Sequence, residues 1–286
     1  MHIPVLQKEV LRYLDPQPNQ NFIDGTIGGG GHSAAILERI APQGKILGID
    51  WDSEILKAAK FKNNLVLACD NFSNLAEIVK KTKFGKADGV LLDLGMSSWH
   101  LADSGRGFSF QKKEALDMRY GLENQLTAEK IVNYWSKLEL ERILREYGEE
   151  RFAGEIAENI VAARKAKPII DTFQLVEIIK KSVRGRQKIH PATRTFQALR
   201  IAVNDELNNL EKVLPQALQV LRRRGRLVII SFHSLEDRIV KKFLEEKKQE
   251  NLLEILTRKP ISPSPQEIKM NRRARSAKLR AAQKTI

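Results

Sequence analysis

Four consecutive glycines, Gly28 to Gly31, separate an apolar run from an amphipathic stretch, and this loop restricts the possible folds more than any other feature. Glycines remove every Cβ from a turn, so a ligand can approach the backbone closely. A helix that starts after such a turn also offers free N–H groups to a carboxylate or phosphate. Its position between a buried strand and a helix argues against a flexible surface loop. The loop therefore predicts a ligand-binding turn of an α/β protein.

Short apolar runs alternate with amphipathic stretches from residue 20 to residue 95, which predicts strands and helices in turn. The predicted strands are Asn21–Asp24, Lys45–Asp50, Leu65–Asp70 and Asp88–Leu94, and the predicted helices are His32–Ile40, Ser53–Phe61 and Leu75–Lys81. This order implies a parallel sheet with right-handed crossovers. Aspartates lie at or near the strand ends, where folds of this kind bind ligands.

The apolar spacing becomes purely helical between Gly107 and Pro191, which predicts an inserted all-helical domain. The expected domains are residues 1–106 and 192–286, which together form one α/β domain, and 107–191, the insert. After Ala192 we expect a long helix toward Leu221 with an interruption near Pro215. The remaining expected elements are a buried strand at Arg226–Phe232, a helix at Ser234–Lys247, and strands at Leu252–Arg258 and Ser276–Ala282.

An acid at the end of the second predicted strand, Asp50, can accept hydrogen bonds from both hydroxyls of an adenosine ribose. That interaction suits NAD and S-adenosylmethionine equally. Gly29, Gly31 and Ala34 match the weak G-x-G-x-x-A pattern of dinucleotide-binding proteins, so a NAD(P)-type dehydrogenase is one alternative. Asp24 argues against a dehydrogenase, because a carboxylate in the loop would repel a pyrophosphate. The same carboxylate is compatible with a sulfonium cofactor that carries an amino group.

The 49 basic and 35 acidic residues give a net charge of +14, concentrated in residues 180–200 and 269–286, which contain no acid. Such segregation favours a polyanionic partner such as nucleic acid. The alternative is a solvated charged face and a loose tail without a partner. No apolar run reaches the length of a membrane span, and we expect no contact with a membrane. A single cysteine, Cys69, rules out an internal disulfide, and the N-terminal residues lack the features of a secretion signal. We therefore expect a cytoplasmic protein.

Seven motifs in one order span nearly the whole chain and are similar to those of the MraW family of ribosomal RNA small subunit methyltransferases. They are Asp24-Gly-Thr-Ile-Gly-Gly-Gly-Gly-His-Ser33, Asp93-Leu-Gly-Met-Ser-Ser98, Arg106-Gly-Phe-Ser-Phe110, Leu116-Asp-Met-Arg119, Tyr147-Gly-Glu-Glu-Arg-Phe152, His190-Pro-Ala-Thr-Arg-Thr-Phe-Gln-Ala198 and Ser231-Phe-His-Ser-Leu-Glu-Asp-Arg238. The resemblance implies methyl transfer from S-adenosylmethionine to the exocyclic N4 of a cytidine in the decoding centre (P site) of bacterial 16S rRNA. It also implies a class I methyltransferase fold, a Rossmann-like parallel sheet with an antiparallel C-terminal strand, carrying an inserted helical domain.

Motif matching to this family assigns cofactor contacts to seven residues: Gly30, Gly31, His32, Asp50, Phe72, Asp93 and His100. The family pattern places Asp50 on the ribose and Phe72 beside the adenine. His100 departs from the pattern, because family members carry Gln there; both side chains can donate one hydrogen bond. His32 could instead serve only to cap its helix. No residue is assigned to a metal.

Methylation of a cytosine amine needs an acceptor for an amino proton, because the nitrogen lone pair is delocalised into the ring. The acceptor is Asp93 or a backbone carbonyl of its turn, unless Asp93 serves the cofactor alone. The predicted partner is 16S rRNA or the small ribosomal subunit, and a homodimer is left open. The expected RNA contacts are Arg184, Arg186, Lys188, Arg194 and His233. Asp237 is expected beside His233 at the opening of the substrate site. Trp99, Phe108 and Phe110 are candidates for stacking on the target base. A non-catalytic RNA-binding assembly factor is the other alternative.

Overall fold

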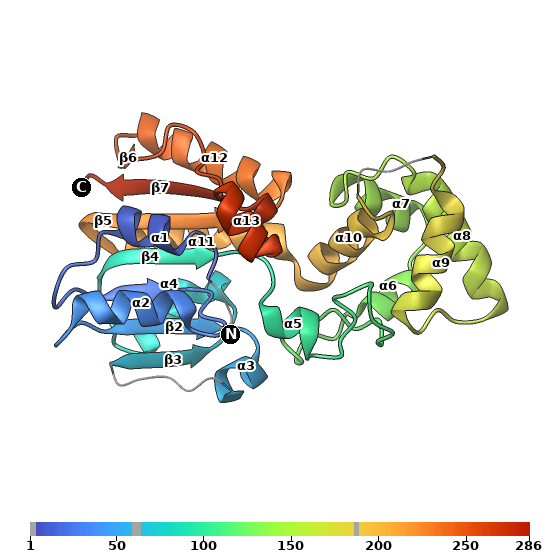
Figure 1. Ribbon diagram of the computed structural model, residues 1–286, viewed down its shortest axis with the longest axis horizontal. Coiled ribbons are helices and arrows are strands. Elements are labelled where there is room, and N and C mark those ends of the chain that lie inside the picture. Colours follow the sequence, from blue (N-terminus) through green and yellow to red (C-terminus); the bar gives the residue numbers. More distant parts are fainter. Residues whose placement is uncertain (1–3, 59–63, 186–188) are drawn as a thin grey trace. The chain divides into compact units, whose positions relative to one another are not determined.

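The computed structural model describes residues 4–58, 64–185 and 189–286 and divides into two compact units (Figure 1). The sheet unit comprises Met1–Gly95 and Leu207–Ile286, and the helical unit comprises Met96–Glu206. The helical unit thus begins before and ends after the insert expected at 107–191. The difference arises because the helix expected to open the second α/β segment buries Phe196, Leu199 and Val203 in the helical core.

The described part of the sheet unit contains a seven-stranded sheet in the order β3-β2-β1-β4-β5-β7-β6. The strands are β1 (Phe22–Asp24), β2 (Ile46–Asp50), β3 (Leu65–Cys69), β4 (Ala87–Asp93), β5 (Leu221–Ser231), β6 (Leu253–Ile255) and β7 (Lys278–Lys284). Strands β1 to β5 pair in parallel, whereas β7 runs antiparallel to both β5 and β6. The predicted parallel sheet with an antiparallel C-terminal strand is confirmed.

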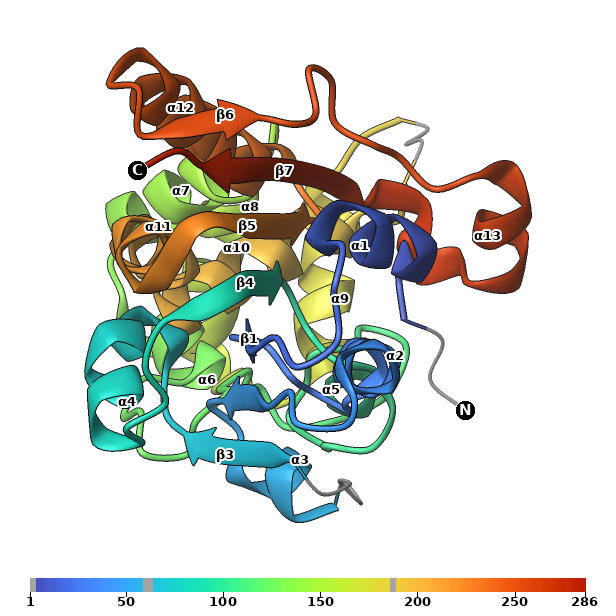
Figure 2. The same cartoon turned by 90° about the vertical axis from the view of Figure 1, so that its left-hand side faces the viewer.

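Successive residues along the strands enter two different apolar cores, one on each face of the sheet. Ile23 and Leu47 face a core that includes residues of α4 (Leu75–Lys81), α11 (Glu206–Val220) and α12 (Ser234–Gln249). Phe22 and Ile46 face the other core, with α1 (Gln7–Leu14) and α2 (Gly31–Ile40). Figure 2 shows these two sets of helices on opposite sides of the strands. Burial on both faces explains why the strands appear in the sequence as unbroken apolar runs.

The helical unit has its own core, to which six described helices contribute apolar residues. These are α5 (Ser98–Ala102), α6 (Ala128–Tyr134), α7 (Lys137–Glu146), α8 (Ala153–Ala166), α9 (Thr172–Ser182) and α10 (Ala192–Asn204). Helix α5 contributes Leu101 alone. Hydroxyl or carboxylate side chains cap four of these helices by accepting a backbone N–H of the first turn. The caps are Ser97 for α5, Thr127 for α6, Ser136 for α7 and Asp171 for α9. Shorter elements of the sheet unit are α3 (Ser53–Ala58), α13 (Pro265–Met270), η1 (Phe72–Asn74) and η2 (Arg272–Ser276).

The helix expected from Ala192 to Leu221 is interrupted at Asp205 and not near Pro215. Asp205 adopts a left-handed conformation with φ of 51° and ends α10, while Pro215 lies inside α11. A proline within a helix removes one hydrogen bond and clashes with the preceding turn. Here the surrounding residues Leu214, Ala217 and Leu218 are buried against the sheet, and this packing holds the helix.

Strand β5 begins at Leu221, earlier than the expected Arg226, because the exposed residues 222–224 hide it from an apolar pattern. Leu221 pairs with Ala87 ahead of an irregularity in the β4–β5 register. The helix expected at Ser53–Phe61 is described as far as Ala58, and its remaining residues lie outside the described ranges. No helix in the described ranges is long and apolar enough to cross a bilayer.

Candidate active site

The glycine loop joins β1 to α2 at the carboxyl edge of the sheet, and two of its residues need a backbone that favours glycine. Gly28 and Gly30 have φ of 48° and 75°. The N–H of Gly28 donates to Oδ2 of Asp50 at 3.0 Å, and Oδ1 of Asp50 accepts the N–H of Asp52 at 2.9 Å. Asp50 therefore lies against the loop at the end of β2, as the sequence predicts for a ribose-binding acid.

The first turn of α2 has no side-chain cap among the described residues, because Gly30 occupies the N-cap position. The N–H groups at such a helix start are the usual partners of an anionic ligand group. Gly31 has a further packing role, since an added Cβ would lie 2.5 Å from Cγ of Pro4. Its carbonyl also accepts Nε2 of Gln7 at 3.3 Å, so the N-terminal segment covers one side of the loop.

Four polar side chains cluster where β1 and β4 end side by side: Asp24, His32, Ser33 and Asp93. Asp24 is buried and accepts the Ser33 hydroxyl at 2.7 Å and the Thr26 N–H at 3.2 Å. Nε2 of His32 lies 3.5 Å from Oδ2 of Asp93. The backbone N–H of Asp93 donates to the Thr26 hydroxyl at 2.7 Å, which ties the end of β4 to the loop.

The buried carboxylates and imidazole of this cluster have shifted pKa values. Burial raises the pKa of Asp24 above its usual range despite the hydrogen bond from Ser33. Burial alone would lower the pKa of His32, but the carboxylates of Asp93, Asp24 and Glu267 outweigh it and raise that pKa. The neighbouring carboxylates therefore favour the protonated form of His32.

Nδ1 of His32 and Oδ1 of Asp93 are buried and lack a hydrogen-bond partner among the described residues, and Nε2 of His32 has only its 3.5 Å contact with Asp93. An unsatisfied buried polar atom costs about 1–3 kcal/mol, so such atoms indicate a polar ligand. The carboxylate oxygen can accept from an amino group, and an imidazole N–H can donate to a carboxylate. Together with Asp50 for hydroxyls, the edge fits a ligand with an amino-acid part and a ribose.

Phe72 lies in η1, directly after β3, and packs against the core on the α4 side of the sheet. A Cβ added to Gly25 would lie 3.8 Å from Cβ of Phe72, which places the start of this side chain beside the end of β1. The side chain of Asn71 accepts the N–H of Ser73 at 2.9 Å and fixes the turn. Phe72 is thus near the loop, where an aromatic face could lie beside a flat ring.

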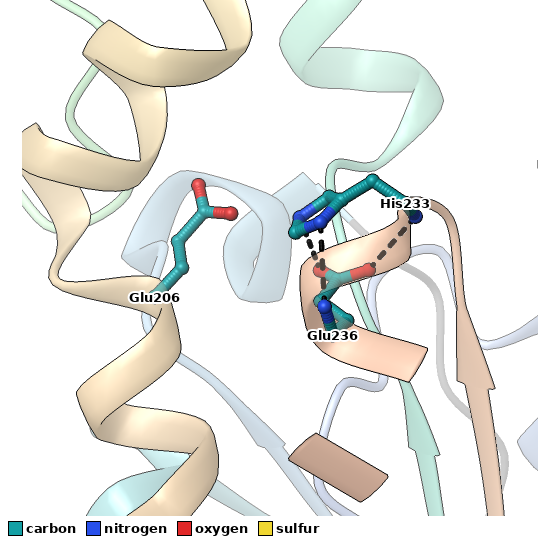
Figure 3. A group of neighbouring side chains, drawn as sticks. All are labelled: Glu206, His233 and Glu236. Atoms are coloured by element: carbon teal, nitrogen blue, oxygen red, sulfur yellow. Dashed lines mark hydrogen bonds and ion pairs between the residues drawn. The ribbon is translucent and has the colours of Figure 1, made fainter. Parts of the chain in front are cut away.

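His233 follows β5 at the same edge of the sheet, but its side chain is buried and engaged locally (Figure 3). Its Nε2 lies 3.2 Å from Oε1 of Glu236, and its Nδ1 accepts the Glu236 N–H at 3.4 Å. Glu236 also accepts the N–H of Phe232 at 2.8 Å. The pair forms a capping box at the start of α12. Glu206, also drawn in Figure 3, belongs to the helical unit, where Arg200 Nε contacts its carboxylate at 2.8 Å.

Asp237, expected near the same site, pairs with two cations of β7 in this structure. Its carboxylate accepts Nε and Nη2 of Arg280 at 2.6 and 3.1 Å and lies 3.4 Å from Nζ of Lys278. These cations hold the pKa of Asp237 below its usual range, although burial alone would raise it. The residue ties α12 to β7.

The other predicted site residues belong to the helical unit. His100 is buried, caps α5 through a box with Ser97, and packs against Phe108 and Tyr120 with ring centroids 4.9 Å apart. The assignment of His100 to the cofactor therefore stays a prediction. Arg184 is exposed, Arg194 is half-buried, and Arg186 and Lys188 lie outside the described residues.

The three stacking candidates also differ in exposure. Phe108 is buried in the helical core, so its role as a base-stacking residue is wrong for this structure. Phe110 stacks on His190 with centroids 4.5 Å apart, and Arg106 lies over the ring of Trp99. Phe110 and Trp99 are half-buried and stay candidates.

The sequence assigned no site role to Thr26, Ser33 or Glu267. Thr26 and Ser33 lie inside the glycine motif, so their hydroxyls were visible as hydrogen-bonding groups of the loop. Glu267 accepts the Leu6 N–H at 2.7 Å and thereby holds the segment that covers Gly31. No short-range pattern links two residues so distant in the chain.

Comparison with known proteins agrees with this geometry. A family model described as the MraW methylase family matches residues 1–285. The ribosomal RNA small subunit methyltransferase H of Heliobacterium mobile is 47% identical, covering 99% of this chain and 98% of that protein. The protein of the same name from Symbiobacterium thermophilum is 46% identical, with 99% and 96% covered.

A solved structure of a candidate rRNA methylase from Clostridium thermocellum covers 99% of this chain and 100% of its own, with a TM-score of 0.50. At 11% identity this likeness concerns the fold alone. With the strand order above, it confirms the class I methyltransferase fold, whereas the dehydrogenase alternative is wrong. The chain belongs to the MraW methylase family and is a methyltransferase with S-adenosylmethionine as its cofactor.

Proposed function

We propose that the protein methylates the exocyclic N4 of a cytidine in the P site of 16S rRNA, in the cytoplasm. The carboxylate of Asp93 carries the proposal, since it has a buried oxygen without a partner at the carboxyl edge of the sheet. The names of the two relatives above support small-subunit rRNA as the substrate. The seven sequence motifs support the choice of base.

The cofactor supplies an electrophilic methyl group. We assign its ribose hydroxyls to Asp50 and its adenine to Phe72, at the ends of β2 and β3. The N–H of Gly31 and the imidazole of His32 would hold its carboxylate, because they are donors at a helix start. Gly30 would line this position through its backbone only, since its N–H already donates to the Ile27 carbonyl at 2.7 Å. By fixing the two reacting groups in line, these residues would provide most of the rate enhancement.

Asp93 is the residue that we assign to the amino proton of cytosine. Oδ2 is 3.5 Å from His32, while Oδ1 is buried without a partner, so one oxygen remains for an N–H donor. Accepting that hydrogen bond would localise the nitrogen lone pair and receive the proton after transfer. The hydrogen bond from the Asp93 N–H to Thr26 holds the turn in position.

The reaction is tested by incubating the protein with isotopically labelled S-adenosylmethionine and either unmodified small subunits or free 16S rRNA. Digestion to nucleosides and mass analysis should place the label in N4-methylcytidine. The better of the two substrates shows whether the enzyme acts before or after subunit assembly. Label in another nucleoside, or no label although the cofactor binds, would overturn the proposal.

The role of Asp93 is tested with Asp93→Asn, using Asp70→Asn as the matched control at the end of β3. We expect Asp93→Asn to lower kcat about 100-fold or more, the usual contribution of a proton acceptor. Asp70 already accepts Asn71 N–H and Asn74 Nδ2 and should tolerate the change. Unchanged turnover with intact cofactor binding would remove the carboxylate from this role, and a loss confined to cofactor affinity would assign it to the cofactor alone.

The first basic segment, residues 180–200, is proposed to contact RNA phosphates. The contacts are assigned to Arg184, Arg186, Lys188 and Arg194. Neutralising Arg184, Arg186 and Lys188 together should weaken RNA binding and flatten its salt dependence, because fewer counterions are released. Cofactor affinity should stay unchanged. His233 is a weaker candidate, since its ring already pairs with Glu236.

A further inference from the structure

A second set of cations is exposed on the sheet unit, within residues 269–275, which we call the C-terminal basic segment. Lys269 lies in the last turn of α13, and Arg272, Arg273 and Arg275 lie in η2; all four are exposed. Among the described residues, Lys269, Arg272 and Arg275 form no ion pair with an acid. The neighbouring acid, Glu267, is engaged by the Leu6 N–H at 2.7 Å.

The later cations of the same basic run have structural partners. Lys278 and Arg280 contact Asp237, at 3.4 and 2.6 Å. Nζ of Lys284 donates to the carbonyls of Leu218 and Leu221 at 3.0 and 3.1 Å. The structure therefore separates one run of basic residues into a part that stabilises the sheet unit and a part that faces solvent.

The backbone of the C-terminal basic segment is held by groups other than its charges. Ala274 and Ala277 are buried in the core beside α1, with 0% and 2% of their surface exposed. Ser264 caps α13 by accepting the Glu267 N–H, and Asn271 caps η2 by accepting the Arg273 N–H. A fixed backbone lowers the entropy cost of binding, and long basic side chains on a buried scaffold are what a charged ligand requires.

The segment lies at the same edge of the sheet as the candidate active site (Figure 1). It leads directly into Lys278, which pairs with Ser231 at the carboxyl end of β5, while Ile230 pairs with Asp93 on β4. It also contacts the glycine loop indirectly: Glu267 holds Leu6, and Pro4 packs on Gly31.

We infer that Lys269, Arg272 and Arg275 bind the phosphate backbone of the substrate RNA beside the active site, independently of the first basic segment. This inference rests on the proposed function, because it needs an RNA substrate at this edge. Three exposed cations close together in the chain, with no acidic partner among the described residues, match a polyanion. The contacts would position the RNA without reading its sequence, as phosphate contacts do.

The test compares Lys269→Gln/Arg272→Gln/Arg275→Gln with Lys80→Gln/Lys83→Gln/Lys86→Gln. The second variant is the control, because it removes the same charge from three exposed lysines at the opposite edge of the sheet, before β4. These lysines line one surface cavity of about 350 Å³. Each protein is assayed for labelled methyl transfer to small subunits and 16S rRNA, for 16S rRNA affinity between 50 and 200 mM salt, and for S-adenosylmethionine affinity. A charge-retaining variant, Lys269→Arg/Arg272→Lys/Arg275→Lys, checks that the segment still folds.

We expect the first variant to raise KM for RNA at least about fivefold and to reduce the salt slope by about 2, since each lost phosphate contact removes about 0.7–0.9. Cofactor affinity should not change, and the charge-retaining variant should bind RNA like the wild type. Equal losses in the control variant would mean a bulk charge effect and overturn the inference, as would an unchanged KM and slope. If the wild type itself transfers no label to either substrate, the proposed function fails, whereas wild-type activity with an unaffected variant refutes the surface alone.

Discussion

The ion pair between Asp237 and Arg280 gives the sharpest test of whether a motif residue serves chemistry or stability. Asp237 belongs to a motif at the carboxyl end of β5, yet its two oxygens accept Nε and Nη2 of Arg280 at 2.6 and 3.1 Å. The two side chains are 13% and 10% exposed, so most of their charge is removed from water. We expect Asp237→Asn to destabilise the sheet unit and to leave methyl transfer per folded molecule unchanged.

The magnitude follows from what the substitution leaves behind. Removing one partner of a buried pair costs about 3–5 kcal/mol, because the other charge stays buried without compensation. Residual exposure of both side chains points to the lower end, about 3 kcal/mol. At about 2–4 °C per kcal/mol for a domain of roughly 150–250 residues, Tm should fall by about 6–12 °C.

The pH dependence has a definite sign. Arg280 and Lys278 hold the pKa of Asp237 below its usual value, despite burial. The pair's contribution to stability is therefore fully present above the pKa of an aspartate in the unfolded chain, about 3.9, and is lost as pH falls through the folded pKa. The difference in Tm between wild type and Asp237→Asn should be constant from pH 6 to 8 and shrink only below about pH 4.

Thermal unfolding and labelled methyl transfer, measured on the same preparations, decide between the two roles. Asp237→Leu/Arg280→Met serves as the control, because replacing both charges by apolar groups is often neutral. That double variant should regain at least half of the lost stability. A variant Asp237→Asn with unchanged Tm and abolished turnover would refute the structural role and assign the carboxylate to the substrate mouth.

Three further predictions concern the sheet unit and the helical unit. Gly48→Ala should cost about 1–3 kcal/mol in chemical denaturation, because the new Cβ would clash with the side chain of Ile27. Ile27→Ala should relieve this clash. Arg119→Lys should lower stability by about 1–3 kcal/mol, since the guanidinium binds both oxygens of Asp117 and two backbone carbonyls; an unchanged midpoint would contradict this. The pKa of His32 is raised in the folded protein. Its contribution to the free energy of unfolding is therefore complete below about pH 6.5 and is lost as pH rises through the folded pKa. The stability difference between wild type and His32→Gln should therefore shrink from pH 6 to 9, and a growing difference would refute the assignment.

Much of the sheet unit was predictable because local rules determine it. Strands buried on both faces appear as apolar runs, so β1, β2, β3 and β4 were expected within one residue or so of their ends. Glycines in positive-φ turns identified the loop. Once strand order is parallel, Asp24, Asp50 and Asp93 must gather at one edge.

The boundary between the units was not predictable from periodicity. Helix α10 has the same apolar spacing whether it packs on a sheet or on other helices, and only its contacts with the helical core decide. The break at Asp205 carries no glycine or proline, whereas the proline at position 215 lies within a helix that packing holds together. Strand β5 begins with Leu221 followed by three arginines, which no apolar pattern would include.

Charge shows most clearly what a local count omits. The two basic runs look alike in the sequence, since neither contains an acid. In the structure each run meets an acid from outside its window: Arg200 pairs with Glu206 at 2.8 Å, and Arg280 pairs with Asp237 at 2.6 Å. A cation that is buried and paired in this way cannot meet a phosphate without leaving the other charge uncompensated. The cations available to RNA are therefore those that the fold leaves exposed, such as Lys269 and Arg272, and net charge alone overstates their number.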